Sequence, residues 1–129
     1  MPVELRYLTY VAVLTALFWI PYILNEISVR GLMDAVGYPA APKPLAPWAQ
    51  RLKAAHYNGV ENLVVFAALV LTAHALGVHS AAVAGSAIVY FWARVVHAVV
   101  YALGIPWLRT LSFAVAWGCQ ICIAWQILH

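Results

Sequence analysis

The sequence predicts an all-α integral membrane protein, folded as a four-helix bundle in one domain that covers residues 1–129. Hydrophobic residues make up 66% of the chain and charged residues only 9%, whereas a soluble domain carries roughly 25% charged residues. Four apolar stretches are each long enough to cross a bilayer, since a membrane-spanning helix needs about 20 mostly apolar residues. Short segments rich in glycine and proline separate these stretches, as expected for the loops of a bundle.

Proline and glycine set the limits of the four predicted spans. The spans are Tyr7–Ile27, Ala54–Leu76, Ala81–Leu103 and Leu108–Leu128. The segment Arg30–Pro47 holds two glycines and four prolines, a composition that cannot continue a helix. Short turns at residues 77–80 and 104–106 make the last three spans antiparallel neighbours. Pro21 is expected to kink the first span, because proline cannot donate the backbone hydrogen bond of a helix interior.

The basic residues predict how the spans are oriented. The first loop, the entry to the second span and the third loop together carry Arg30, Lys43, Arg51, Lys53 and Arg109. The opposite side carries only Arg6. Because Lys and Arg concentrate in cytoplasmic loops, the first and third loops are expected in the cytoplasm and both termini outside. The net charge of +3 is too small for a nucleic-acid-binding surface, so no nucleic-acid partner is expected.

Two charged residues, Glu61 and Arg94, lie deep inside predicted spans. A charge at the centre of a bilayer costs at least about 2.5 kcal/mol, so such residues usually face a partner, a cavity or a substrate. Both have polar neighbours at helical spacing. These neighbours are Arg51, Asn58 and Asn62 in the second span, and His97 and Tyr101 in the third. Each set is expected to project to one side of its helix.

The depth of these residues predicts a polar cleft. At 1.5 Å per residue, Glu61 lies about 18 Å and Arg94 about 14 Å from the cytoplasmic ends of their spans. The two charges are therefore expected at one level, as the floor of a cleft that opens to the cytoplasm, with Asn58 and His97 one turn above. A structural ion pair between Glu61 and Arg94 is the competing interpretation, with the asparagines as interhelical hydrogen-bonding groups and His97 as packing.

The residue types of this cleft suit a small zwitterionic ligand with several carboxylates, such as a peptide. Arginine binds carboxylates through paired hydrogen bonds. Glu61 can receive an ammonium group, and Asn58 offers a donor and an acceptor to an amide. No metal is expected, because His56, His97 and Glu61 do not form a ligand motif.

Two other pairs of chemically active residues are interpreted as structural or solvated. Cys119 and Cys122 lie within the fourth span, away from other ligands. Two small buried apolar residues are more common there than a redox pair. His74 and His79 lie at the opposite surface and are expected to be solvated.

Two motifs at a fixed spacing contain the polar residues. The first is RLKAAHYNGVEN at residues 51–62, followed by Phe66, and the second is RVVHAVVYALGIPWLRT at residues 94–110. Together they resemble the signatures of the MAPEG family, the membrane-associated proteins in eicosanoid and glutathione metabolism. The resemblance extends to span order and loop lengths over nearly the whole chain, and is to the small bacterial members. A bacterial inner membrane is therefore the expected location, with both termini periplasmic.

The resemblance implies a homotrimer of four-helix protomers that binds glutathione between subunits near the cytoplasmic side. By matching position, Asn58 and Glu61 would hold the backbone and the ammonium group of glutathione. The other residues expected at this site are Arg30, Arg51, Asn62, Arg94, His97, Tyr101 and Thr110. Arg109 resembles the arginine that stabilises the glutathione thiolate, and it is the expected catalytic residue. In a trimer, Arg94 would meet Glu61 of its own subunit or of a neighbour.

The function that the resemblance implies is that of a microsomal-type glutathione transferase or peroxidase. Its thiolate would attack a hydrophobic small-molecule electrophile delivered from the membrane lipid. The sequence departs from the family's pattern at Ala54 and Tyr57, where basic residues are frequent, at Phe113, which replaces a tyrosine, and at Thr110, which replaces a serine. These departures favour a second hypothesis, a non-catalytic membrane binding or assembly protein that keeps the fold. A secondary transporter is disfavoured because four spans leave little room for alternating access.

Overall fold

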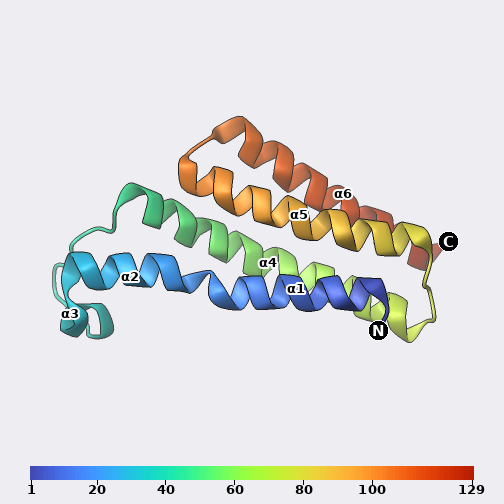
Figure 1. The fold of residues 1–129 in the computed structure, drawn as a ribbon, viewed down its shortest axis with the longest axis horizontal. Coiled ribbons are helices and arrows are strands. Elements are labelled where there is room, and N and C mark those ends of the chain that lie inside the picture. Colours follow the sequence, from blue (N-terminus) through green and yellow to red (C-terminus); the bar gives the residue numbers. More distant parts are fainter.

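The computed structural model describes residues 1–129 as an all-helical protein without strands (Figure 1). In chain order the helices are α1 Val3–Leu17, α2 Trp19–Arg30, α3 Leu32–Val36, α4 Pro47–Ala75, α5 Ala81–Leu103 and α6 Pro106–Leu128. α1 and α2 together form one segment of 28 residues. This segment, α4, α5 and α6 are each long and apolar enough to cross a membrane. The predicted all-α bundle with four membrane-length helices is confirmed.

The connections between the long helices gather at two ends of the bundle (Figure 1). The N-terminus, the C-terminus and the turn between α4 and α5 lie at one end, named here the terminal end. The α3 segment and the turn between α5 and α6 lie at the other end, named here the loop end. The motifs at residues 51–62 and 94–110 therefore both lie toward the loop end.

Three helices begin earlier than the sequence predicted, α6 by two residues at Pro106. α1 begins at Val3 and not Tyr7, and α4 begins at Pro47 and not Ala54. Proline is favoured in the first turn of a helix, where its missing N–H would have no partner anyway. Pro47 therefore starts a helix, although it was expected in a loop, and that loop itself contains the short helix α3.

The first span is interrupted at Phe18, three residues before Pro21. Pro21 has no N–H to donate to the carbonyl of Leu17, and in an uninterrupted helix its ring would collide with that carbonyl. α1 ends at Leu17, and the Phe18 N–H donates to the Thr15 carbonyl at 3.4 Å. The kink predicted from Pro21 is therefore found as a break in the first span at Phe18.

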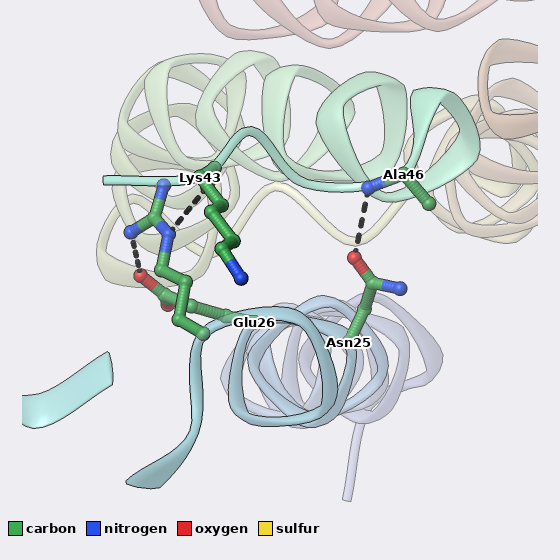
Figure 2. A network of polar contacts seen from close by, with 5 residues as sticks. Asn25, Glu26, Lys43 and Ala46 are labelled. Atoms are coloured by element: carbon green, nitrogen blue, oxygen red, sulfur yellow. Dashed lines mark hydrogen bonds and ion pairs between the residues drawn. The ribbon is translucent and has the colours of Figure 1, made fainter. Parts of the chain in front are cut away.

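Polar contacts hold the segment between α2 and α4 in place (Figure 2). Arg30 pairs with Glu26 one turn earlier at 2.5 Å, and its Nε donates to the Lys43 carbonyl at 2.7 Å. The side-chain oxygen of Asn25 accepts from the backbone N–H of Ala46, directly before α4, at 3.0 Å. The end of α2 and the start of α4 are therefore joined at the loop end.

α5 lies at the centre of the bundle and packs against α1, α4 and α6. The main core consists of nine buried residues: Val11, Phe66, Val70, Ala87, Tyr90, Ala93, Ala116, Cys119 and Ile123. The rings of Phe66 and Tyr90 stack at 3.8 Å with their planes 8° apart. This contact packs α5 against α4 one turn before Arg94, the first polar residue that follows Tyr90 in α5. Cys122 is half-buried, and neither cysteine forms a disulfide.

Polar contacts also join the helices at the terminal end. Glu4 of α1 pairs with His79 in the turn between α4 and α5, with 2.6 Å between Oε1 and Nδ1. Ser80 in the same turn caps the first turn of α5 and donates to Gln126 of α6 at 3.0 Å. His79 is exposed, as expected, and the fold also pairs it with Glu4, a residue 75 positions away in the sequence. His74 is exposed, as expected.

Candidate functional site

Polar side chains from α4, α5 and α6 meet in a cleft at the loop end. The cleft has a volume of about 330 Å³ and is lined by Asn58, His97, Tyr101, Arg109, Thr110 and Phe113. A second hollow of about 230 Å³ shares Tyr101 and Arg109 with the cleft and is also lined by Arg51. The structure therefore brings together residues of both sequence motifs.

The α5 side of the cleft follows from the spacing of its polar residues. Arg94, His97 and Tyr101 share one stripe of the helix. Arg94 and His97 are 3% and 2% exposed, and Tyr101 is half-buried. α5 ends at Gly104, whose φ of +77° lies in the left-handed region that favours glycine at the end of a helix. The stripe therefore runs from the bundle interior to the mouth of the cleft.

Arg51 reaches from α4 to the end of α5. Its Nε donates to the Ala102 carbonyl at 2.9 Å, which satisfies one of the carbonyls left open at a helix end. A Cβ at position 104 would lie 3.3 Å from the Arg51 guanidinium, so Gly104 also leaves room for this side chain. The contact holds the charge of Arg51 beside the second hollow.

Arg109 is an exposed cation at the mouth of the cleft. Its guanidinium carbon lies 4.8 Å from the centre of the Tyr101 ring, which is a cation–π contact. Both ion pairs of the structure lie elsewhere, at the end of α2 and at the terminal end. No acidic side chain neutralises Arg109, so its charge is available to a ligand.

The structure corrects the expected relation between Glu61 and Arg94. Arg94 donates from Nη2 to the side-chain oxygen of Asn58 at 2.8 Å, whereas Glu61 is exposed and forms no ion pair. Arg94 therefore lies at the level of Asn58, about one turn from the expected level. Glu61 comes three residues after Asn58, so its side chain points about 60° away from Asn58 around the helix. Depth along the helix does not predict this difference in direction. No Glu61–Arg94 pair forms within the chain, and Arg94 is buried behind Asn58, not at the floor of the cleft.

Two further residues expected at the site do not line the cleft. Asn62 donates from Nδ2 to the backbone carbonyl of Asn58 at 2.9 Å. Arg30 is engaged at the end of α2 by Glu26 and by the Lys43 carbonyl. By contrast, Thr110 lines the cleft, and its hydroxyl donates to the Pro106 carbonyl at 3.2 Å.

Two polar contacts near the site were not found from the sequence. Gln120 of α6 is 4% exposed and donates from Nε2 to the Asn62 carbonyl at 3.1 Å. Between α2 and α4, the Tyr22 hydroxyl and His56 Nδ1 lie 2.7 Å apart. The contact of Gln120 could have been predicted, because Gln120 is an amide in an otherwise apolar span and polar side chains within membrane helices often hydrogen-bond to other helices.

Comparison with known proteins identifies the family of this chain. The model of the MAPEG family matches residues 8–129, which is nearly the whole chain. No curated protein and no solved structure matches. With four helices of membrane length and composition, the chain is an integral multi-pass membrane protein, and it belongs to the MAPEG family.

Proposed function

We propose that this protein is a glutathione-dependent transferase or peroxidase that acts on hydrophobic electrophiles in the membrane. The MAPEG family includes glutathione transferases and peroxidases as well as other members. The observation that carries the proposal is the Arg109 guanidinium, which lies over Tyr101 at the mouth of a polar cleft without an acidic partner. A guanidinium beside a thiol lowers the thiol pKa from about 8.5 and raises the fraction of reactive thiolate.

The lining of the cleft supports glutathione as the thiol. Glutathione carries carboxylates at both ends, and the cleft and its neighbouring hollow offer Arg51 and Arg109 but no acidic side chain. Arginine binds carboxylates through parallel hydrogen bonds. Asn58, His97 and Tyr101 add uncharged polar groups for the peptide backbone. The cleft thus suits an anionic peptide that presents its sulfur near Arg109.

A homotrimer would supply the acidic group that the cleft lacks. Glu61 lies on an exposed face of α4 whose other members include Val60, Val64 and Val65. A charge that faces the bilayer centre costs at least about 2.5 kcal/mol, so this face is expected to contact another subunit. Glutathione would then bind between subunits, with its ammonium group paired to Glu61.

The proposed chemistry begins with loss of the thiol proton to water. In a transfer reaction, the thiolate attacks an electrophilic carbon, a C–S bond forms, and the displaced electron pair leaves with a departing group or takes up a proton. In a peroxidase reaction, the thiolate attacks a peroxide oxygen, an S–O bond forms as the O–O bond breaks, and the alkoxide takes up a proton and leaves as an alcohol. A second glutathione thiol then attacks the sulfur of the resulting sulfenic acid, so that an S–S bond forms, the S–O bond breaks and water leaves. In both reactions Arg109 stabilises the thiolate before it attacks.

The proposed orientation places the cleft in the cytoplasm of a bacterial cell. The loop end carries most of the basic residues, namely Arg30, Lys43, Arg51, Lys53 and Arg109. The terminal end carries only Arg6. Membrane proteins concentrate Lys and Arg on the cytoplasmic side, and glutathione keeps thiols reduced in that compartment. The site would therefore face the compartment that contains its thiol.

Titration of reduced glutathione into the purified protein, followed by ultraviolet absorbance, tests the proposal. Wild type is expected to show a thiolate signal, and Arg109→Ala is expected to lose it. The control is Arg6→Ala, which removes the same charge from the terminal end and is expected to behave like wild type. Turnover with a hydrophobic electrophile and with a lipid hydroperoxide then separates transferase from peroxidase.

One feature of the cleft favours the second candidate, a non-catalytic membrane binding or assembly protein. Phe113 lines the cleft with an aromatic ring that has no hydroxyl group to contact a thiol. If wild type gives no thiolate signal and Arg109→Ala is indistinguishable from it, the enzymatic proposal is wrong. If wild type and Arg109→Ala then form the same oligomer, this result would support the second candidate.

A further inference from the structure

The orientation of the Asn58 side chain is fixed by its neighbours. Its Oδ1 accepts from Arg94 Nη2 at 2.8 Å and from Asn62 Nδ2 at 3.3 Å. Arginine has donors only, so the Asn58 atom that faces Arg94 must be the oxygen and not the nitrogen. Asn58 Nδ2 is therefore turned away from Arg94. It is not buried and has no protein acceptor, and the side chain lines the cleft.

A second set of contacts connects this amide to α6. Asn62 Nδ2 also donates to the Asn58 backbone carbonyl at 2.9 Å, and the Asn62 carbonyl accepts from Gln120 Nε2 at 3.1 Å. Gln120 and Arg94 are 4% and 3% exposed, so a ligand in the cleft does not reach them. Each donates one hydrogen bond to α4, Arg94 to the Asn58 side-chain oxygen and Gln120 to the Asn62 carbonyl.

We propose that Arg94, Asn62 and Gln120 are positioning residues, which hold Asn58 Nδ2 in the cleft as a fixed donor to a carbonyl or carboxylate oxygen of the ligand. The identity of that ligand as glutathione rests on the proposed function. A fixed N–H donor selects an oxygen that carries no proton, and it does not receive an ammonium group. Asn58 therefore adds to the donors of Arg51 and Arg109, and any acceptor for the ammonium group must come from elsewhere.

Asn58→Asp removes the donor of the side chain and keeps its size and one oxygen. Aspartate keeps an oxygen for Arg94 and Asn62, but it replaces the NH₂ group that faces the cleft with a second, charged oxygen. The probe is S-methylglutathione, which keeps the carboxylates and carbonyls of glutathione without an ionisable thiol. Its affinity is expected to fall at least about tenfold, because a donor is replaced by a repulsive oxygen. The unfolding midpoint is expected at or above that of wild type, which shows that the fold is kept. Equal or tighter binding would overturn the proposal.

Gln120→Met tests the positioning contacts without altering the cleft lining. Methionine has a similar volume but no donor for the Asn62 carbonyl. Affinity for S-methylglutathione is expected to fall about threefold to tenfold, the range of one hydrogen bond. At saturating glutathione the thiolate absorbance is expected to be unchanged, because Arg109 is untouched. Gln126→Met, on the same helix at the terminal end, is the matched control and is expected to bind like wild type. Wild-type affinity in Gln120→Met would overturn the positioning role.

The outcomes also distinguish this inference from the proposed function. If wild type binds S-methylglutathione and the Asn58 and Gln120 variants bind it equally well, the positioning role is wrong and the proposed function stands. If wild type binds neither S-methylglutathione nor glutathione, the proposed function is wrong, and Asn58 has no ligand of this class.

Discussion

Replacement of Phe66 by alanine tests the packing that holds α5 on α4. Phe66 is fully buried and stacks on Tyr90 at 3.8 Å. The substitution removes about 100 Å³ of side chain, which at about 24 cal/mol per Å³ of cavity costs roughly 2.4 kcal/mol. Loss of the aromatic pair adds about 0.5–1.5 kcal/mol. Lipid is as apolar as the core, so burial in the bundle adds little transfer free energy. The expected loss in free energy of unfolding is therefore about 3–4 kcal/mol.

The assay is the unfolding of purified protein in mixed micelles, followed by circular dichroism as the fraction of denaturing detergent rises. Leu71→Ala is the matched control, because Leu71 lies on the same helix with 52% of its surface exposed. That variant is expected to lose less than about 0.5 kcal/mol from contacts within the chain, since 52% of the Leu71 surface makes no contact there. Equal losses in the two variants would refute the reasoning, because stability would then not depend on contacts between α4 and α5.

Three further substitutions test contacts at the ends of the bundle by the same assay. Gly104→Ala is expected to lose about 1–2 kcal/mol, because alanine is strained at a φ of +77° and its Cβ meets Arg51; an unchanged midpoint would contradict this. Glu4→Gln is expected to lose about 1 kcal/mol by removing the charge that faces His79, and the same loss in a background that already lacks His79 would show that the pair is not responsible. Asn25→Ala is expected to lose about 1 kcal/mol, because the backbone N–H before α4 loses its acceptor; Asn25→Asp, which keeps an oxygen, should stay close to wild type.

The fold was predictable from the sequence because a bilayer imposes a simple rule on composition. A span needs about 20 apolar residues, and the chain meets this requirement four times, with glycine or proline between the spans. The limits were harder to predict, because proline both ends helices and starts them. Pro21 interrupts a helix and Pro47 begins one. Pro21 follows a helical segment whose carbonyl needs a hydrogen-bond donor, whereas Pro47 is the first residue of its helix and has no helical residue before it. Composition does not reveal this difference.

The residues of the candidate site were predictable where their position depends on the geometry of a single helix. Asn58, His97 and Tyr101 were found from spacing within their own spans and Arg109 from the family resemblance, and the structure gathers them in one cleft. Contacts between helices were predicted less well, since they depend on the rotation and axial shift of each helix. A shift of one turn is enough to place Arg94 against Asn58 and not beside Glu61. The contact of Gln120 with α4 depends on the same unknown rotation.

The pairing of Arg94 with Asn58 has a consequence for biogenesis. An isolated α5 would carry an unsatisfied guanidinium into hydrocarbon, and arginine at the centre of a span opposes insertion by about 2.5–3.5 kcal/mol. α4 and α5 are consecutive and joined by a short turn, so the hydrogen bond between them lies within a single helical hairpin. The insertion machinery is therefore expected to release α4 and α5 into the lipid together, as one hairpin, after both have been synthesised. A truncated chain that ends after α5 should insert with the topology of the full protein, whereas α5 behind an unrelated first span should often fail to insert.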